Sequence, residues 1–153
     1  MMDGHLSELV IRYCAEEVER QRDTAIHVYH MVKAWAWATD KAQEFRYPRE
    51  NQVISVGHLV KPSVNLPYTF RGCNVRVGNH FPPDWGDVER LMARWVDAVH
   101  DASLTADEAY KEFQLIHPFR DGNGRAGKIL YNWIQGTLSK PLMPPDFFGC
   151  SNP

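Results

Sequence analysis

Residues 117–128 read HPFRDGNGRAGK and combine one imidazole, one carboxylate, three cations and three glycines within twelve positions. Glycine leaves the backbone open to close approach, and the first turn of a helix leaves its N–H groups without internal partners. Such amides, together with the positive end of the helix dipole, bind anions. The stretch therefore predicts a loop and a helix start that hold a phosphate-bearing group beside a base.

Helices are predicted on both sides of this loop. Thr105 and Glu108 form a T-x-x-E capping box that opens the preceding helix. A second helix is predicted to run from just after Gly124 to about Leu138. The residues expected on the inner faces are Ala109, Tyr110, Phe113 and Ile116 on the first helix, and Ala126, Leu130, Trp133 and Ile134 on the second.

The first part of the chain also favours helices. Residues 7–44 contain no proline or glycine, which is typical of long helical segments. One helix face is predicted there from the spacing of Ala25, Tyr29, Val32 and Ala36. The sequence ENQVISVGHLV, residues 50–60, predicts a short helix that ends before Pro62. Residues 62–72 are expected to be a loop.

The second part of the chain holds the clearest amphipathic pattern. Its apolar positions are Val88, Leu91, Met92, Trp95, Val96 and Val99. Near the end, four prolines in residues 139–153 predict a tail that wraps over the surface.

Only residues 73–81, CNVRVGNHF, resemble a β-hairpin. Val75 and Val77 alternate with Arg76, and Gly78-Asn79 is a hairpin-turn dipeptide. Two prolines follow Phe81 and would end the return strand. We therefore predict an all-α helical bundle that carries a single small β-hairpin, built as one domain over residues 1–153.

Composition bounds the class of protein. A length of 153 residues with 44% apolar and 24% charged residues fits one globular domain. The net charge of −2 disfavours a broad electrostatic contact with nucleic acid, and no apolar run has the length of a membrane span. Cys14, Cys73 and Cys150 are far apart, which favours reduced thiols. We expect a cytoplasmic protein that binds neither nucleic acid nor a membrane.

The residue types in the loop suggest a division of chemical roles. Gly122 and Gly124 would open the backbone amides to a phosphate, and Asn123 could donate its side-chain amide. Arg125 and Lys128 stand three positions apart and can share one side of the new helix.

Asp121 and His117 extend these roles beyond anion binding. Asp121 would repel a phosphate unless a cation lay between them, and Mg²⁺ is the usual one. His117 titrates near neutral pH and could accept a proton from a hydroxyl.

Two other interpretations of these residues are weaker. Residues 122–128 fit the G-x-x-x-x-G-K core of a P-loop, but Ile129 stands where Ser or Thr is needed and the preceding segment reads as a helix. A single histidine near a helix end is more often structural than catalytic. His27 and His30 are three positions apart with no third metal ligand in reach, which favours a surface or core pair.

The whole string resembles the signature of the Fic family, HPFx(D/E)GNGRxxR, and matches every fixed position but the last, where Lys128 replaces an arginine. The resemblance extends over residues 50–138, so that residues 1–49 form an N-terminal helical extension. NVRVGNHFPP and the following VERLMARWV occupy the places of the family's flap and helix. Arg71 stands where the family usually has an arginine before the flap.

This resemblance implies a protein adenylyltransferase, which transfers AMP from ATP to a Ser, Thr or Tyr hydroxyl of a target protein and releases pyrophosphate. His117 would deprotonate the hydroxyl, and Asp121 would bind Mg²⁺. The anion hole would be formed by Gly122, Asn123 and Gly124, with Arg125 and Lys128 at the phosphates. The residues of the target-docking flap would be Val75, Arg76, Val77, Gly78, Asn79, His80 and Phe81.

Several alternatives stay open. Lys128 in place of arginine predicts weaker handling of the terminal phosphate and leaves transfer of UMP, phosphocholine or phosphate as options. Removal of AMP from a modified protein, or a non-catalytic nucleotide-binding module, are others. Only Glu50 is followed by Gly or Asn, and it lacks the Ser or Thr of the family's inhibitory motif, (S/T)xxxE(G/N). We therefore expect a toxin-like activity restrained by an antitoxin-like partner or not restrained in this way, and a second copy is a further candidate partner.

Overall fold

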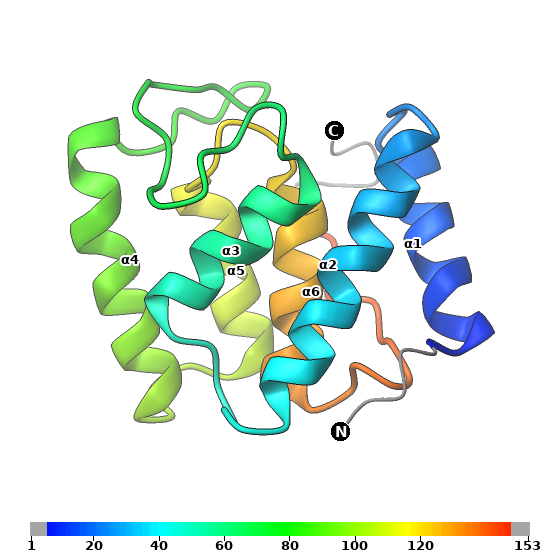
Figure 1. The fold of residues 1–153 in the computed structure, drawn as a ribbon. Coiled ribbons are helices and arrows are strands. Elements are labelled where there is room, and N and C mark those ends of the chain that lie inside the picture. The colour runs from blue at the N-terminus through cyan, green and yellow to red at the C-terminus, as the bar shows by residue number, and fades with distance from the viewer. Residues whose placement is uncertain (1–5, 148–153) are drawn as a thin grey trace.

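The computed structural model describes residues 6–147, which form six α-helices and contain no β-strand (Figure 1). The predicted all-α class is therefore confirmed. The helices are α1 (Glu8–Arg20), α2 (Ile26–Ala42), α3 (Glu50–Val60), α4 (Trp85–His100), α5 (Ala106–Ile116) and α6 (Asn123–Gln135). None of them is both long and apolar enough to cross a lipid bilayer.

Helix α6 lies at the centre of the bundle. It packs against α2, α3 and α5, while α1 covers α2 and α4 covers α5 (Figure 1). All but two of its thirteen residues are buried. Because α6 begins with the motif residues Asn123–Arg125, the position of the site is fixed by the most buried element of the protein.

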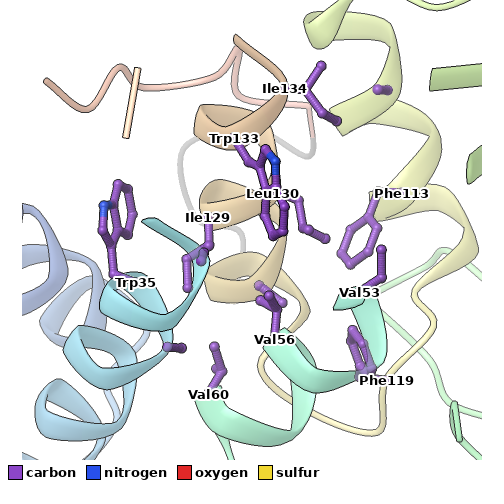
Figure 2. Packing of buried hydrophobic residues seen from close by; sticks show 14 of the residues in the cluster. Trp35, Val53, Val56, Val60, Phe113, Phe119, Ile129, Leu130, Trp133 and Ile134 are labelled. Carbon is purple, nitrogen blue, oxygen red and sulfur yellow. The ribbon is translucent and has the colours of Figure 1, made fainter. Parts of the chain in front are cut away.

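The apolar core joins the motif loop to the bundle. Figure 2 shows side chains of α2, α3 and α5 converging on Ile129, Leu130 and Trp133 of α6. Phe119 of the motif loop belongs to this core and is 1% exposed. Its ring lies against Gly57 of α3, where an added Cβ would be only 2.2 Å from two ring carbons. The phenyl ring therefore anchors the loop to α3.

Several predicted elements are confirmed. Helix α3 spans the predicted residues 50–60, and α4 buries Val88, Met92, Trp95 and Val99. Thr105 and Glu108 form both hydrogen bonds of the capping box, at 2.9 and 3.1 Å. The predicted buried faces of α5 and α6 are also found.

The C-terminal part differs slightly from the prediction. Helix α6 ends at Gln135 rather than near Leu138, because Gly136 adopts a left-handed conformation with φ of +80° and ends the helix. The described part of the tail forms no helix, and Leu142 bonds to Tyr13 of α1 and Asn132 of α6. The predicted tail residues 148–153 lie outside the described part of the chain.

The buried helix face predicted from Ala25, Tyr29, Val32 and Ala36 is wrong. Residues 7–44 form two helices, and Ala25 and Tyr29 are exposed while Met31 and Trp35 of α2 are fully buried. The break lies at Arg22, which adopts a left-handed φ of +56°. Neither Gly nor Pro marks this break in the sequence.

Hydrogen bonds around the break account for it. The N–H groups of Arg22 and Asp23 donate to Glu19 and Val18 at 2.9 and 3.1 Å, which is the Schellman pattern of a helix end. The Asp23 carboxylate then accepts the N–H of Thr24 at 2.8 Å, a local bond that competes with a continuing helix.

The predicted β-hairpin is also wrong. In the described chain, residues 73–81 contain only one antiparallel bridge, between Val77 and His80, around a turn in which Gly78 has φ of +57°. The ends of the segment are held by side chains instead: Arg71 donates to the carbonyls of Cys73 and Pro83. An isolated two-stranded ribbon is marginal in water, and the prolines after Phe81 have no N–H to extend one.

Candidate active site

His117 ends α5 in a left-handed conformation with φ of +52°, which is costly for a residue with a side chain. Its N–H donates to the Phe113 carbonyl at 2.9 Å. The guanidinium of Arg71, which is 5% exposed, donates to the carbonyls of His117 at 2.7 Å and Ile116 at 3.2 Å. These bonds stabilise the turn that places the imidazole in the site.

The imidazole is neutral at physiological pH. Burial, helped by the nearby Arg71 and His80, lowers the pKa of His117 to about 4, although the Gln114 carbonyl and Asp121 act in the opposite direction. Its Nδ1 lies 3.4 Å from the Gln114 carbonyl, which can only accept a hydrogen bond. This contact assigns the proton to Nδ1 and leaves Nε2 with a free lone pair.

The motif loop is held by its own side chains. Asn123 accepts the N–H of Phe119 at 2.9 Å and donates to the Phe119 carbonyl at 2.8 Å. Gln114 donates to the Asn123 carbonyl at 3.1 Å. The Asn123 side chain, which was predicted to donate to an anion, therefore holds the loop instead.

The start of α6 is open to an anion. The first internal bond of the helix joins the Ala126 N–H to the Gly122 carbonyl, so the N–H groups of residues 123–125 precede it. Gly122 has φ of +74°, and an added Cβ would lie 2.9 Å from Val60 Cγ1. Glycine is therefore required at this position both by conformation and by space.

Arg125 is 3% exposed and faces the same space. Its Nη1 lies 3.0 Å from Asp23 Oδ2 as an ion pair. Within the described chain, however, neither Nε nor Nη1 makes a hydrogen bond of good geometry. Buried guanidinium donors without partners are costly, and an anionic ligand would satisfy them.

Asp121 is ionised and half-exposed. Burial would raise the pKa of its carboxyl, but hydrogen bonds from Lys61 and from the Gly122 N–H lower it overall. Lys61 Nζ lies 2.6 Å from Asp121 Oδ2, and Asn65 donates to the Asp121 carbonyl at 2.8 Å. The described residues include no group of three or more His, Cys, Asp or Glu placed to hold a metal ion. One carboxylate nevertheless suits Mg²⁺, which often binds through one or two carboxylates, water and substrate phosphates.

Lys128 was predicted to lie at the phosphates, but in the structure it points to α1 instead. It is 6% exposed, and its Nζ donates to Glu17 Oε2 of α1 at 2.9 Å. Glu17 is fully buried and also bonds to Arg20 and Gln21. Glu17 does not fit the motif (S/T)xxxE(G/N), because Tyr13 stands four positions before it and Val18 follows it. Its position on the buried stripe of Val10 and Cys14 was the available signal.

The motif loop, the flap segment and the α1–α2 turn lie at the same end of the bundle (Figure 1). A cavity of about 400 Å³ between them brings these groups together. It is lined by His117, residues 120–125, residues 21–23, Lys61 and residues 75–78. Half of the predicted flap therefore reaches the cavity. Asn79 is exposed outside it, His80 bonds to the Leu115 carbonyl at 2.9 Å, and Phe81 is 71% exposed.

Relatives were identified by sequence. The Fic/DOC family model matches residues 25–135. Protein adenylyltransferase Fic of Drosophila persimilis is 44% identical over 83 residues, which cover 50% of this chain and 16% of the relative. The protein of the same name from Drosophila virilis is 43% identical over 83 residues, with the same coverage. The chain thus matches only a small part of the length of these curated relatives.

Solved structures share the fold. An IbpAFic2 variant in complex with adenylylated Cdc42 has a TM-score of 0.70 at 15% identity and covers 95% of this chain and 53% of that one. A Fic family protein from Desulfovibrio desulfuricans G20 has a TM-score of 0.59 at 21% identity and covers 84% of this chain and 48% of that one. At such identities the likeness concerns the fold alone. Since the family model spans α2 to α6 and includes the motif loop, the chain belongs to the Fic/DOC family.

Proposed function

We propose that the chain is a protein adenylyltransferase that transfers AMP from ATP to a Ser, Thr or Tyr hydroxyl of a target protein. The observation that carries this proposal is the cavity in which the neutral imidazole of His117 lies with the open first turn of α6 and the buried guanidinium of Arg125. Nucleotide binding alone would need the amides and the cation but no base. The activity named for the Drosophila relatives supports the same assignment.

The reaction follows from the position of the base. The hydroxyl oxygen attacks the α-phosphorus of ATP, and the bond from that phosphorus to the α–β bridging oxygen breaks, so that pyrophosphate leaves with this oxygen. His117 takes the hydroxyl proton at Nε2, since Nδ1 faces the Gln114 carbonyl. The N–H groups of residues 123–125 and Arg125 stabilise the negative charge on the phosphates.

Asp121 is the residue that would hold Mg²⁺. When bound, the ion would neutralise the charge of the phosphates and fix their position. The ionised, half-exposed carboxylate fits this role, and Asn65 holds the backbone of Asp121 at both its N–H and its carbonyl. Asn65 is thus a positioning residue for the metal ligand.

The flap segment would receive the target. Val75 and Arg76 line the cavity, and the main-chain bridge begins only at Val77. A target segment could therefore pair with this part of the flap as an added strand and bring its hydroxyl to His117. The complex of IbpAFic2 with Cdc42 supports a protein as the acceptor.

Labelled ATP tests the proposal directly. With ATP labelled at the α-phosphate and Mg²⁺, the full chain should label itself or a protein in an extract. His117→Ala should lower the rate by roughly 10²–10⁴-fold, while ATP binding is retained. His100→Ala, which removes a histidine bonded to the Pro48 carbonyl away from the cavity, is the control and should label normally. Equal labelling by the His117 variant would refute the assignment.

Glu17 favours a second candidate function, the removal of AMP from a modified protein. The resemblance associates that reaction with a glutamate of the inhibitory type, and Glu17 makes the ion pair expected of one by contacting Lys128. AMP-labelled protein incubated with the unaltered chain distinguishes the two functions. Loss of label that depends on Glu17 would support removal, whereas stable label would leave transfer alone.

Other features of the proposal stay predictions. Use of a donor other than ATP can be measured by competition with UTP. An antitoxin-like partner, a second copy of the chain and a cytoplasmic location each need their own experiment.

A further inference from the structure

Lys61 is a cation of the cavity that the sequence motif does not contain. It follows the last residue of α3, and its side chain is 15% exposed. The ammonium group lies between two carboxylates, 2.6 Å from Asp121 Oδ2 and 3.1 Å from Asp23 Oδ2.

The pair with Asp121 conflicts with the role proposed for this carboxylate. A divalent cation and an ammonium group on the same carboxylate oxygen repel each other at contact distance, so binding of one disfavours binding of the other. Asp121 Oδ1 accepts the Gly122 N–H at 2.7 Å, and Oδ2 accepts from Lys61, so a metal ion bound at Oδ2 would compete directly with Lys61. Metal binding there would favour release of Lys61 from Asp121.

The contacts of Asp23 mark a position in the cavity at which an anionic group would meet Lys61. Its Oδ2 contacts Lys61 Nζ at 3.1 Å and Arg125 Nη1 at 3.0 Å. One anionic oxygen thus lies between the two cations in the same cavity as the start of α6. A phosphate oxygen in this position would meet both cations.

We propose that Lys61 is a nucleotide-binding residue: it pairs with Asp121 when no metal ion is bound there, and it binds an ATP phosphate once Mg²⁺ occupies that carboxylate. This inference rests on the proposed function. It predicts that metal and nucleotide bind cooperatively through Lys61, because each metal ion bound frees one cation for the phosphates.

Binding measurements on the full chain test this prediction without relying on activity. Calorimetry with α,β-methylene-ATP, whose bridging carbon prevents AMP transfer, is done with and without Mg²⁺. Lys61→Met should weaken binding with Mg²⁺ by roughly 10- to 100-fold, as expected for one hydrogen bond to a charged group. Mn²⁺ binding without nucleotide, followed by electron paramagnetic resonance, should become several-fold tighter because the competing ammonium is gone.

Two control variants separate this role from others. Lys41→Met makes the same change at the C-terminal end of α2, whereas the cavity lies near the N-terminal end of that helix. The Lys41 ammonium lies over the Trp37 ring, so this variant should change neither affinity. Lys61→Arg keeps the charge and should retain most of the nucleotide affinity. The inference about Lys61 would be overturned if Lys61→Met bound the nucleotide as tightly as the unaltered chain, or bound Mn²⁺ more weakly. Either result would leave the proposed function untouched. Failure of the unaltered chain to bind the nucleotide with Mg²⁺ would overturn the proposed function as well.

Discussion

The motif loop, residues 117–125, and the α1–α2 turn, residues 21–25, line the same cavity but are held by different contacts. The loop is fixed by bonds that leave its binding groups open: Asn123 bonds to Phe119, and Phe119 packs on Gly57. The α1–α2 turn is held instead by ion pairs with cations of the cavity. Asp23 pairs with Arg125 and Lys61, the cations that would bind phosphates.

The difference shows which region is preorganised and which must change. The hydrogen bonds of Asn123, which hold the motif loop, would remain when a nucleotide binds. Asp23 of the α1–α2 turn and Glu17 in the last turn of α1 instead place carboxylates on cations, Asp23 on Arg125 and Lys61, and Glu17 on Lys128. Asp23 would therefore compete with a phosphate for Arg125 and Lys61.

The largest expected effect comes from breaking the contact of α1 with Lys128. Glu17→Gln removes the charge of a fully buried carboxylate. Breaking such a pair typically costs about 3–5 kcal/mol of stability, because the partner charge is left buried and unpaired. We expect AMP transfer to rise about 10-fold, the size of a typical coupling between two sites, as Lys128 becomes available. Thermal unfolding and labelling with ATP measure the two effects.

Glu16→Gln is the matched control, because it makes the same change at an exposed position of the same helix. It should alter neither the stability nor the rate. A Glu17 variant that is destabilised but transfers AMP no faster would show that the ion pair with Lys128 is only structural.

The motif loop could be predicted from the sequence because its requirements are local. Gly122 needs a left-handed conformation and close approach to Val60, and the helices around the loop follow from the capping box and the apolar spacing. Even there, the role of Asn123 differed, since its amide holds the loop rather than the ligand. The residue types show which chemical groups the loop contains, and the contacts in the structure show which of these groups hold the loop.

The α1–α2 region could not be predicted in the same way. Glu17 and Lys128 are 111 positions apart, and Lys61 and Asp121 are 60 apart, so their pairing depends on the packing of whole helices. The helix break at Arg22 has no glycine or proline to mark it. The hairpin was predicted from alternation, the Gly78-Asn79 turn and the prolines that follow. Arg71, however, holds both ends of that segment through side-chain bonds that these sequence signals do not reveal.

A substitution at Gly57 should break the preorganised region. In Gly57→Ala, the new Cβ would meet the Phe119 ring at 2.2 Å, so the loop or α3 must shift. Overpacking of this kind typically costs about 1–3 kcal/mol, although alanine favours a helix. We expect a lower melting temperature and slower AMP transfer, because Phe119 is two residues from the base.

The control for this change is Gly72→Ala, where no atom lies within 4 Å of the added Cβ. It should leave the rate and the melting temperature unchanged. If Gly57→Ala kept full transfer activity, the anchoring of the loop by Phe119 would not be needed to position His117.

The smallest effect concerns the turn itself. Arg22 has φ of +56° at the position of the Schellman pattern where glycine is preferred, and its side chain lies at the cavity. Arg22→Gly should stabilise the fold by about 1 kcal/mol, since a left-handed residue with a Cβ costs about that much. The melting temperature would then rise by roughly 2–4 °C.

Ala102 is the matched control. It ends α4 with the same pattern and φ of +61°, away from the cavity, so Ala102→Gly should stabilise the fold similarly. Only Arg22→Gly should also weaken nucleotide binding, because only Arg22 offers a cation to the phosphates. If both variants bound nucleotide equally well, the strain at Arg22 would serve the shape of the turn and not the ligand.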